Sequence, residues 1–326
     1  MQWMLNISTH QNDLETLDHN WENARQLLQQ HQFDGFELYP VDGYAFSKIP
    51  SDLIQGVHLR FFPIMDPIWH GNRARLLEIF DDDATIEHFY GGLDREAVIS
   101  VYRKQLDLAH DLGAKYVVFH AAQCELEHIY QWNCPWDWRE TIDMSAEIIS
   151  EVMQDTRYGG EILFENLWWP GSLRLDSPAE IERLMEKTNY SRCGIVLDTG
   201  HILNKNQTIR SEREGIDYIV ETVKSLGASH SLIRAVHLTR SLSAEYVIQS
   251  RQIPNPFENS QNFWDRFIIA HQHVMQIDQH DPFDDPSIER LFDWIDPQFL
   301  IFEFTYRDMA EWNDKIARQR RSLPNL

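Results

Sequence analysis

The chain has 326 residues, of which 43% are hydrophobic, and its formal net charge is −22. This length suits a single α/β barrel with insertions, so we expect one domain over residues 1–326. The strong negative charge disfavours nucleic acids and anionic membranes as partners, because both repel an acidic protein. Cys124, Cys134 and Cys193 show no CxxC spacing, which argues against a zinc ribbon or a disulfide framework.

The chain shows no sign of export or membrane insertion. The N-terminal sequence MQWMLNISTH lacks the basic region and the long apolar run of a signal peptide. No apolar stretch approaches the length of a membrane span. We therefore expect a cytoplasmic protein with reduced thiols that acts on a small-molecule substrate. The sequence leaves the oligomeric state open, and a homo-oligomer is allowed.

Short apolar runs alternate with amphipathic segments along the whole chain. The predicted strands are rich in β-branched and aromatic residues and cover residues 3–7, 33–39, 54–61, 114–120, 161–166, 193–198, 232–238 and 299–304. The predicted helices have apolar residues at helical spacing and cover 13–30, a long helix within 84–112, 137–157, 177–187, 212–226, 258–275, 287–295 and 308–320. Apolar strands without alternation indicate a parallel sheet buried on both faces. No glycine-rich phosphate-binding motif follows a strand, so we favour a closed (β/α)8 TIM barrel over a doubly wound open sheet.

Residues that can bind metals recur along the chain, most of them at the ends of these apolar runs. The set is His58, His120, Glu165, Asp198, His201, His237, Asp278, His280 and Glu303. In an α/β barrel the chemistry takes place where the strands end. Four of these residues end the last four strands, so their side chains can converge on one cation: Glu165, Asp198, His237 and Glu303. Three carboxylates and one imidazole suit a divalent ion such as Mn, Mg, Co or Zn.

Several short motifs carry a resemblance to a known family. GIVLDTGHI contains Asp198 and His201, FEN contains Glu165, VHLTRS contains His237, and FEF contains Glu303. In their order and settings these motifs resemble the xylose isomerase-like barrel superfamily, which includes sugar isomerases, sugar epimerases and endonuclease IV. The resemblance covers most of the chain and implies a TIM barrel with a metal site at its mouth.

The resemblance also implies a choice between a one-metal and a multinuclear site. Endonuclease IV and a related group of multinuclear iron oxidative enzymes use additional ligands, and the matching residues here are His58, His120, His201, Asp278 and His280. This sequence departs from the endonuclease pattern in two ways. Asp278 follows His237 only after 41 residues, and Arg240 stands where the pattern has an acidic residue. The expected cofactor is therefore one to three divalent ions of Mn, Zn, Co, Mg or Fe.

The leading functional hypothesis is a divalent-metal-dependent isomerase or epimerase of a small, sugar-like hydroxy-carbonyl compound. In this hypothesis Glu165 and Glu303 transfer protons to and from a metal-stabilised enediolate, and His201 holds substrate oxygens. The predicted substrate-binding residues are His58, His120, Arg60, Arg240 and Trp168. The alternatives are a multinuclear phosphoester hydrolase and a multinuclear iron oxidative enzyme.

Overall fold

The computed structural model describes all 326 residues and contains a closed barrel of eight parallel strands. Each strand pairs with the next along the chain, and the last strand pairs with the first. The strands are β1 (Gln2–Ser8), β2 (Gly35–Tyr39), β3 (Ile54–His58), β4 (Tyr116–His120), β5 (Glu161–Glu165), β6 (Cys193–Asp198), β7 (Ile233–His237) and β8 (Phe299–Phe302). The predicted TIM barrel is confirmed, and each of the eight predicted strands is present.

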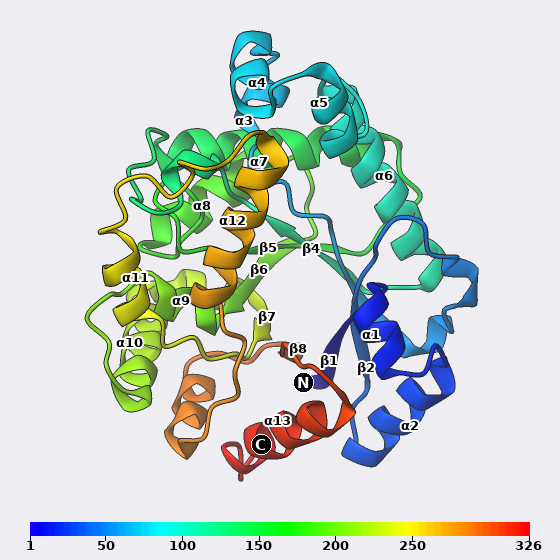
Figure 1. Cartoon of the computed structure of the whole chain (residues 1–326). Helices are drawn as coiled ribbons and strands as arrows, with labels where there is room; N and C mark the ends of the chain where they lie inside the picture. The colour runs from blue at the N-terminus through cyan, green and yellow to red at the C-terminus, as the bar shows by residue number, and fades with distance from the viewer.

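The helices surround this barrel (Figure 1). They are α1 (Gln11–Thr16), α2 (Trp21–His31), α3 (Asp66–Trp69), α4 (Arg73–Phe80), α5 (Asp83–Tyr90), α6 (Arg95–Leu112), α7 (Trp138–Val152), α8 (Pro178–Lys187), α9 (Thr199–Asn204), α10 (Glu212–Ser225), α11 (Ala244–Ser250), α12 (Phe263–Ile277) and α13 (Met309–Arg321). The single helix predicted over 13–30 is wrong. The segment forms two helices, α1 and α2. Asp18 and His19 between them adopt positive φ angles of 52° and 54°, which a right-handed α-helix cannot contain. The segment predicted as a helix over 287–295 forms a 3-10 helix at Pro286–Asp293.

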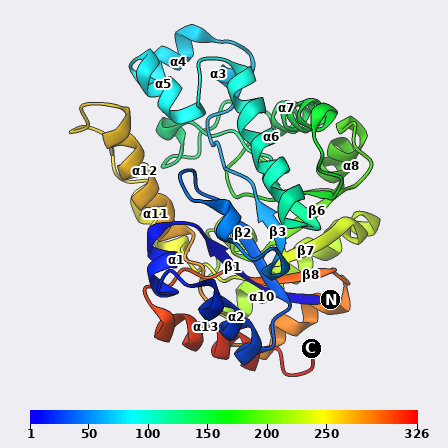
Figure 2. The ribbon, with the colours of Figure 1, turned by 90° about the vertical axis from the view of Figure 1, so that its right-hand side faces the viewer.

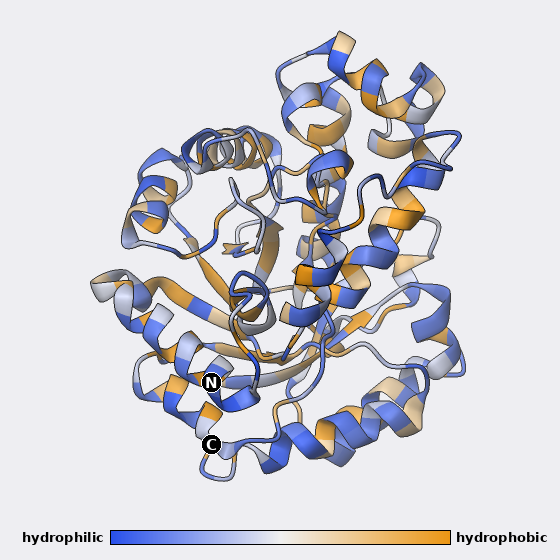
Figure 3. Cartoon of the chain, turned by 60° about the vertical axis from the view of Figure 1, so that its left-hand side comes forward, coloured by the Kyte–Doolittle hydropathy of each residue, from blue (hydrophilic) through white to orange (hydrophobic).

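The apolar residues form two cores that are separated by the barrel wall. Inside the barrel, eight buried residues fill the space below the mouth: Met4, Tyr116, Val118, Leu163, Val196, Ala235, Phe299 and Ile301. A much larger core of 85 residues lies mostly between the strands and the surrounding helices. Figure 3 shows hydrophobic residues on the strands and along the inner faces of the helices, with hydrophilic residues on their outer faces. Both faces of the sheet are therefore buried, as expected for a parallel barrel.

A long insertion between β7 and β8 carries α11 and α12 and returns to the mouth of the barrel. Its return is fixed by an antiparallel backbone bridge in which Arg240 and Asp281 exchange two hydrogen bonds, at 2.7 and 3.0 Å. Figure 1 shows α12 in front of the barrel, and in Figure 2 it projects at the left edge of the molecule, above α11. The bridge places the segment just after α12 beside the end of β7.

The C-terminal helix α13 lies on the outside of the barrel beside β1, near the N-terminus, and Figure 1 shows both chain ends in this region. Arg320 of α13 lies over the ring of Trp3 in β1, with its guanidinium carbon 4.0 Å from the ring centre. None of the helices is both long and apolar enough to cross a lipid bilayer.

Candidate metal centre

The first group of ligand-type side chains lies at the ends of β5 to β8, and we call it the strand-end group. Its members are Glu165, Asp198, His237 and Glu303. His237 Nδ1 lies 3.0 Å from an oxygen of Glu303, 3.6 Å from Glu165 and 3.8 Å from Asp198. Asp198 and His237 are register partners in the sheet, so both side chains point to the same side of the barrel wall. The order of the strands thus brings these four side chains to one point.

A second group, the histidine-pair group, consists of His58, His120 and Glu165. The Nε2 atoms of His58 and His120 lie 3.1 and 3.3 Å from Glu165 Oε2. The other oxygen of Glu165, Oε1, faces His237 and the strand-end group. Glu165 therefore belongs to both groups, with one oxygen toward each.

The third group, the outer group, consists of His201, Asp278 and His280. Asp278 Oδ2 lies 3.2 Å from His201 Nε2 and 2.7 Å from His280 Nε2. His280 Nδ1 also lies 4.0 Å from Glu303 Oε2, which joins the outer group to the strand-end group. The backbone of His280 has a φ angle of 51°, in the left-handed region that a residue with a Cβ rarely occupies. Despite the long insertion, Asp278 and His280 reach the mouth.

The segment after β5 orients members of two groups. The side chain of Asn166 donates to the carbonyl of Asp198 at 3.1 Å and accepts from its amide at 2.9 Å. The carbonyl of Asn166 lies 2.7 Å from His201 Nδ1, so this ring nitrogen donates, and the other, Nε2, faces Asp278 in the outer group. Asp198 Oδ1 accepts from the amide of His201 at 2.6 Å and caps α9. These bonds hold both side chains before any ligand arrives.

The buried charges of the centre strongly perturb one another. Burial raises the pKa of Asp198 to about 7, and the neighbouring carboxylates add to this increase. Burial also opposes ionisation of Glu303, but His237 and His280 together lower its pKa to about 2. Burial works against a charged His280, yet Asp278 and Glu303 raise its pKa to about 10. Without a cation, protonated imidazoles offset the carboxylates, so divalent cations and protons compete for this centre.

The unpaired atoms of the strand-end group fit a bound cation. Asp198 Oδ2, His237 Nδ1 and Glu303 Oε2 are all buried and have no hydrogen-bond partner. Buried polar atoms without partners are rare and each requires an explanation. Two carboxylate oxygens and a ring nitrogen converge here, and a divalent cation that displaced the imidazole proton would bind all three atoms.

Members of all three groups line a cavity of 660 Å³, whereas Asp198 and His237 are not among its lining residues. Aromatic side chains form much of its wall: Tyr39, Phe61, Trp168, Trp169, Phe304 and Tyr306. Trp168 packs against His201 with ring centres 4.9 Å apart, and Phe61 packs against His120 at 4.4 Å. Helix α12 covers one side with His271, Val274 and Met275. No lysine or arginine lines the cavity, whereas five of its residues are aspartate or glutamate.

The structure does not bring Arg60 and Arg240 into this cavity. Arg60 donates to the carbonyl of Phe89 at 2.9 Å and lines a separate pocket outside the barrel mouth. Arg240 forms an ion pair with Glu212 and lies 3.5 Å from Asp284. Each guanidinium turns toward carbonyl or carboxylate partners on the outer side of the rim, so a substrate role for these two residues has no geometric basis.

Sequence reasoning missed Glu37, which lies next to the strand-end group. It stands in the middle of β2 and is 2% exposed. His237 Nε2 lies 3.0 Å from one of its oxygens. The only clue in the sequence is a charged residue inside the apolar run GFELY, because mid-strand positions in a buried parallel sheet are normally apolar.

Comparisons with known proteins agree with this architecture. A family model described as the xylose isomerase-like TIM barrel matches residues 89–321. Similar solved structures include a D-tagatose 3-epimerase-like protein, with a TM-score of 0.51 and 14% identity over 99% of this chain and 97% of that one. Endonuclease IV from Thermus thermophilus gives a TM-score of 0.52 and 13% identity over the full length of both chains. An L-ribulose 3-epimerase gives 0.50 and 12% over 98% and 91%.

Such low identities show a shared fold and no more. A search of curated proteins finds no match. The family model, however, spans well over half of the chain. The chain therefore belongs to the xylose isomerase-like TIM barrel family.

Proposed function

We propose that this chain is a metal-dependent enzyme whose centre holds two or three divalent cations. The observation that carries this proposal is the position of Glu165, whose two oxygens face two different ligand groups. In the proposal, the strand-end group holds one cation, the histidine-pair group a second, and the outer group a third. The mixture of imidazole and carboxylate ligands suits zinc, manganese or ferrous iron.

The reaction that this centre supports best is hydrolysis of a small-molecule phosphoester. Neighbouring cations in such a centre neutralise phosphoryl oxygens and lower the pKa of a water molecule. The cavity offers no lysine or arginine for an anionic group, so the cations are its only permanent positive charges. The net charge of −22 disfavours a nucleic acid as the phosphoester.

The residues around the centre have separable roles in this proposal. Glu165 would serve as a ligand in two groups, and it would then be unable to act as a mobile base, because both of its oxygens would be engaged. Trp168 and Phe61 pack on His201 and His120, where they fix the rings and exclude bulk water. Glu303 Oε2 lies 3.0 Å from His237 Nδ1 and would be a ligand of the strand-end cation, whereas His280 Nδ1, 4.0 Å away, is too distant to exchange a proton with it directly.

A second candidate is isomerisation or epimerisation of a small hydroxy-carbonyl compound. It is favoured by the strand-end group, which is a complete ligand set for one cation by itself. In that case His58 and His120 contact the substrate, and Glu303 moves the proton. Glu165 would then need one oxygen released from the two histidines.

Metal content separates the two candidates. The chain is purified without chelator and its bound metals are counted per chain, together with an optical spectrum. Two or three colourless ions, with hydrolysis of bis(p-nitrophenyl) phosphate or p-nitrophenyl phosphate, support the hydrolase. One ion, with conversion of a neutral ketose and no phosphoester hydrolysis, overturns it in favour of the isomerase. A coloured iron centre that consumes oxygen would instead favour oxidative chemistry.

A matched pair of variants tests the bridging role. Glu165→Gln leaves a ligand with one anionic oxygen fewer, and we expect it to lose at least one cation per chain. Glu161→Gln alters the residue at the opposite end of the same strand, where Glu161 lies 3.6 Å from Arg234, and should keep all of the metal. Equal metal content in the two variants would overturn the multinuclear proposal.

A further inference from the structure

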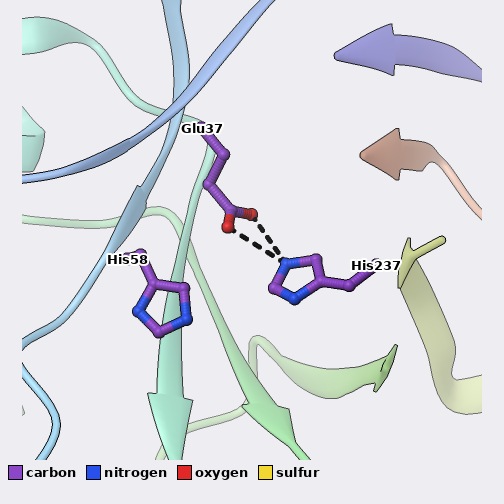
Figure 4. A group of neighbouring side chains, drawn as sticks. All are labelled: Glu37, His58 and His237. Carbon is purple, nitrogen blue, oxygen red and sulfur yellow. Dashed lines mark hydrogen bonds and ion pairs between the residues drawn. The ribbon is translucent and has the colours of Figure 1, made fainter. Parts of the chain in front are cut away.

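Glu37 forms a buried link between two other strands of the barrel. Its Oε1 and Oε2 lie 3.0 and 3.2 Å from His237 Nε2, as the dashed lines in Figure 4 show. The hydroxyl of Tyr116, on β4, donates to Oε2 at 2.7 Å. The carboxyl of Glu37 is thus held from two sides in the interior of the barrel.

The sheet is built to allow this link. Gly56 on β3 is the register partner of Glu37 on one side and of Tyr116 on the other. A Cβ atom at Gly56 would lie 2.3 Å from the ring of Tyr116, closer than any real contact. Tyr116 therefore crosses over β3 in the space that glycine leaves open, and its hydroxyl reaches Glu37. A residue with any side chain at position 56 would block this path.

Glu37, His58 and His237 also lie close enough to hold a cation of their own, but their ring nitrogens are engaged elsewhere. His58 Nε2 lies 3.1 Å from Glu165, and its Nδ1 lies 3.2 Å from the carbonyl of Leu59. His237 Nε2 faces a carboxylate, which only accepts hydrogen bonds, so this nitrogen carries the proton. A protonated ring nitrogen cannot bind a cation, and this excludes a fourth site.

We propose that Glu37 is a positioning residue that prepares His237 to bind a cation through Nδ1. By accepting the hydrogen bond of Nε2–H, Glu37 keeps the proton on Nε2, so that Nδ1, which faces Glu165, Asp198 and Glu303, is the nitrogen that would give up its proton to a cation. Its negative charge also makes Nδ1 a stronger ligand, as carboxylates do behind metal-binding histidines in general. The inference rests on the proposed metal centre. It adds to that centre the residue that orients His237, the one histidine of the strand-end group.

The test compares metal affinity in three variants with the wild-type chain. Glu37→Gln keeps the shape and an acceptor oxygen but removes the charge, and we expect roughly 10- to 100-fold weaker binding of one cation. Tyr116→Phe removes only one hydrogen bond to Glu37, and we expect a smaller loss in the same direction. Glu180→Gln is the matched control, because Glu180 is also buried but caps the backbone before α8, and it should bind metal as the wild type does.

Three measurements distinguish positioning from a structural role. Affinity comes from competition with a chromophoric chelator, using zinc alone as the probe. Thermal unfolding of the metal-free proteins should show midpoints close to wild type. The visible spectrum of the cobalt-loaded protein should change in Glu37→Gln and remain unchanged in Glu180→Gln. If Glu37→Gln fails to fold, Tyr116→Phe alone decides, since it leaves the carboxylate in place.

Two results would overturn the inference. One is a Glu37→Gln variant that binds zinc as tightly as wild type with an unchanged cobalt spectrum. The other is a Glu37→Gln variant that, at saturating metal, holds one ion fewer per chain, because Glu37 would then be a direct ligand. A wild-type chain that binds no zinc or cobalt is a failure of the proposed function itself, and is distinguishable from both.

Discussion

The strand-end group and the outer group are positioned by different parts of the molecule. The strand-end group depends on the closed barrel, because the strand register fixes the position of each strand end and of the side chain that it carries. The second depends on a short helix, α9, and on the segment that follows α12. That segment is held by the bridge between Arg240 and Asp281 and by a hydrogen bond from the amide of Gln279 to Ser241 Oγ at 2.9 Å.

The two groups therefore differ in how easily their ligand side chains can move. Residues at the ends of barrel strands can move only if the barrel itself is distorted, so their geometry is costly to change. Residues on an insertion can shift by breaking a few local hydrogen bonds, since local opening depends on local contacts. We therefore expect the cation of the outer group to exchange first and that of the strand-end group last.

The largest expected effect follows from removing a strand-end carboxylate. Asp198→Ala should lose most of the bound metal, because a carboxylate ligand contributes both charge and geometry. Since Asp198 also caps α9, the alanine variant loses about 1 kcal/mol of stability as well. Asp198→Asn keeps an oxygen for the cap, and its metal content isolates the effect on the cation. Unchanged metal in both variants would contradict the assignment of the strand-end group.

An intermediate effect is expected in the outer group. His280→Ala should lose one cation per chain and keep the others, since His280 belongs only to the outer group. Metal counting after dialysis checks this, and His271→Ala, on the cavity wall but in no ligand group, is the control. Loss of all the metal would show that the two groups do not behave independently.

Much of this contrast could be predicted from the sequence. Strand order in a parallel barrel decides which residues reach the rim, so apolar runs that end in Glu165, Asp198 and His237 were sufficient to predict that these side chains meet. The positions of the arginine side chains were harder to predict, because the sequence does not show that Arg240 forms an ion pair with Glu212 and points away from the cavity. Glu37 was missed because its role depends on Gly56, whose missing side chain lets Tyr116 cross a neighbouring strand.

A smaller effect should follow from loosening the insertion. Ser241→Ala removes the acceptor for the amide of Gln279 and a long hydrogen bond, at 3.4 Å, from the same hydroxyl to Asp278 Oδ1. Loss of one such bond costs about 1 kcal/mol, which corresponds to roughly fivefold weaker binding of the outer cation. Ser250→Ala removes a buried hydroxyl on α11 that bonds only within its own turn, and should leave metal affinity unchanged. Equal affinities in the two variants would show that the Ser241 hydroxyl does not help to position the outer group.

The smallest effect concerns the pH dependence of the insertion. His273 of α12 is buried, stacks on Tyr130 with ring centres 3.8 Å apart, and lies 2.9 Å from the hydroxyl of Tyr246. Burial lowers its pKa to about 4, whereas an exposed histidine has a pKa near 6.5. Between these two values the unfolded chain binds more protons than the folded chain, so stability is fully present above pH 6.5 and decreases as the pH falls toward 4.

We therefore expect that lowering the pH from 7.5 to 5 changes the thermal unfolding midpoint of the metal-free wild type less favourably than that of His273→Phe. Phenylalanine keeps a ring against Tyr130 but has no proton to gain. The difference between the two proteins matters, because the other histidines titrate equally in both. Hydrogen exchange should locate the acid-sensitive amides in α12 before those of the strands, because the insertion rests on its own contacts while the strands are locked in a closed barrel. Identical pH profiles for wild type and His273→Phe would show that His273 does not contribute to the acid sensitivity. The metal-centre histidines His201, His237 and His280 have raised pKa values, so they favour the folded state as the pH falls and act in the opposite direction.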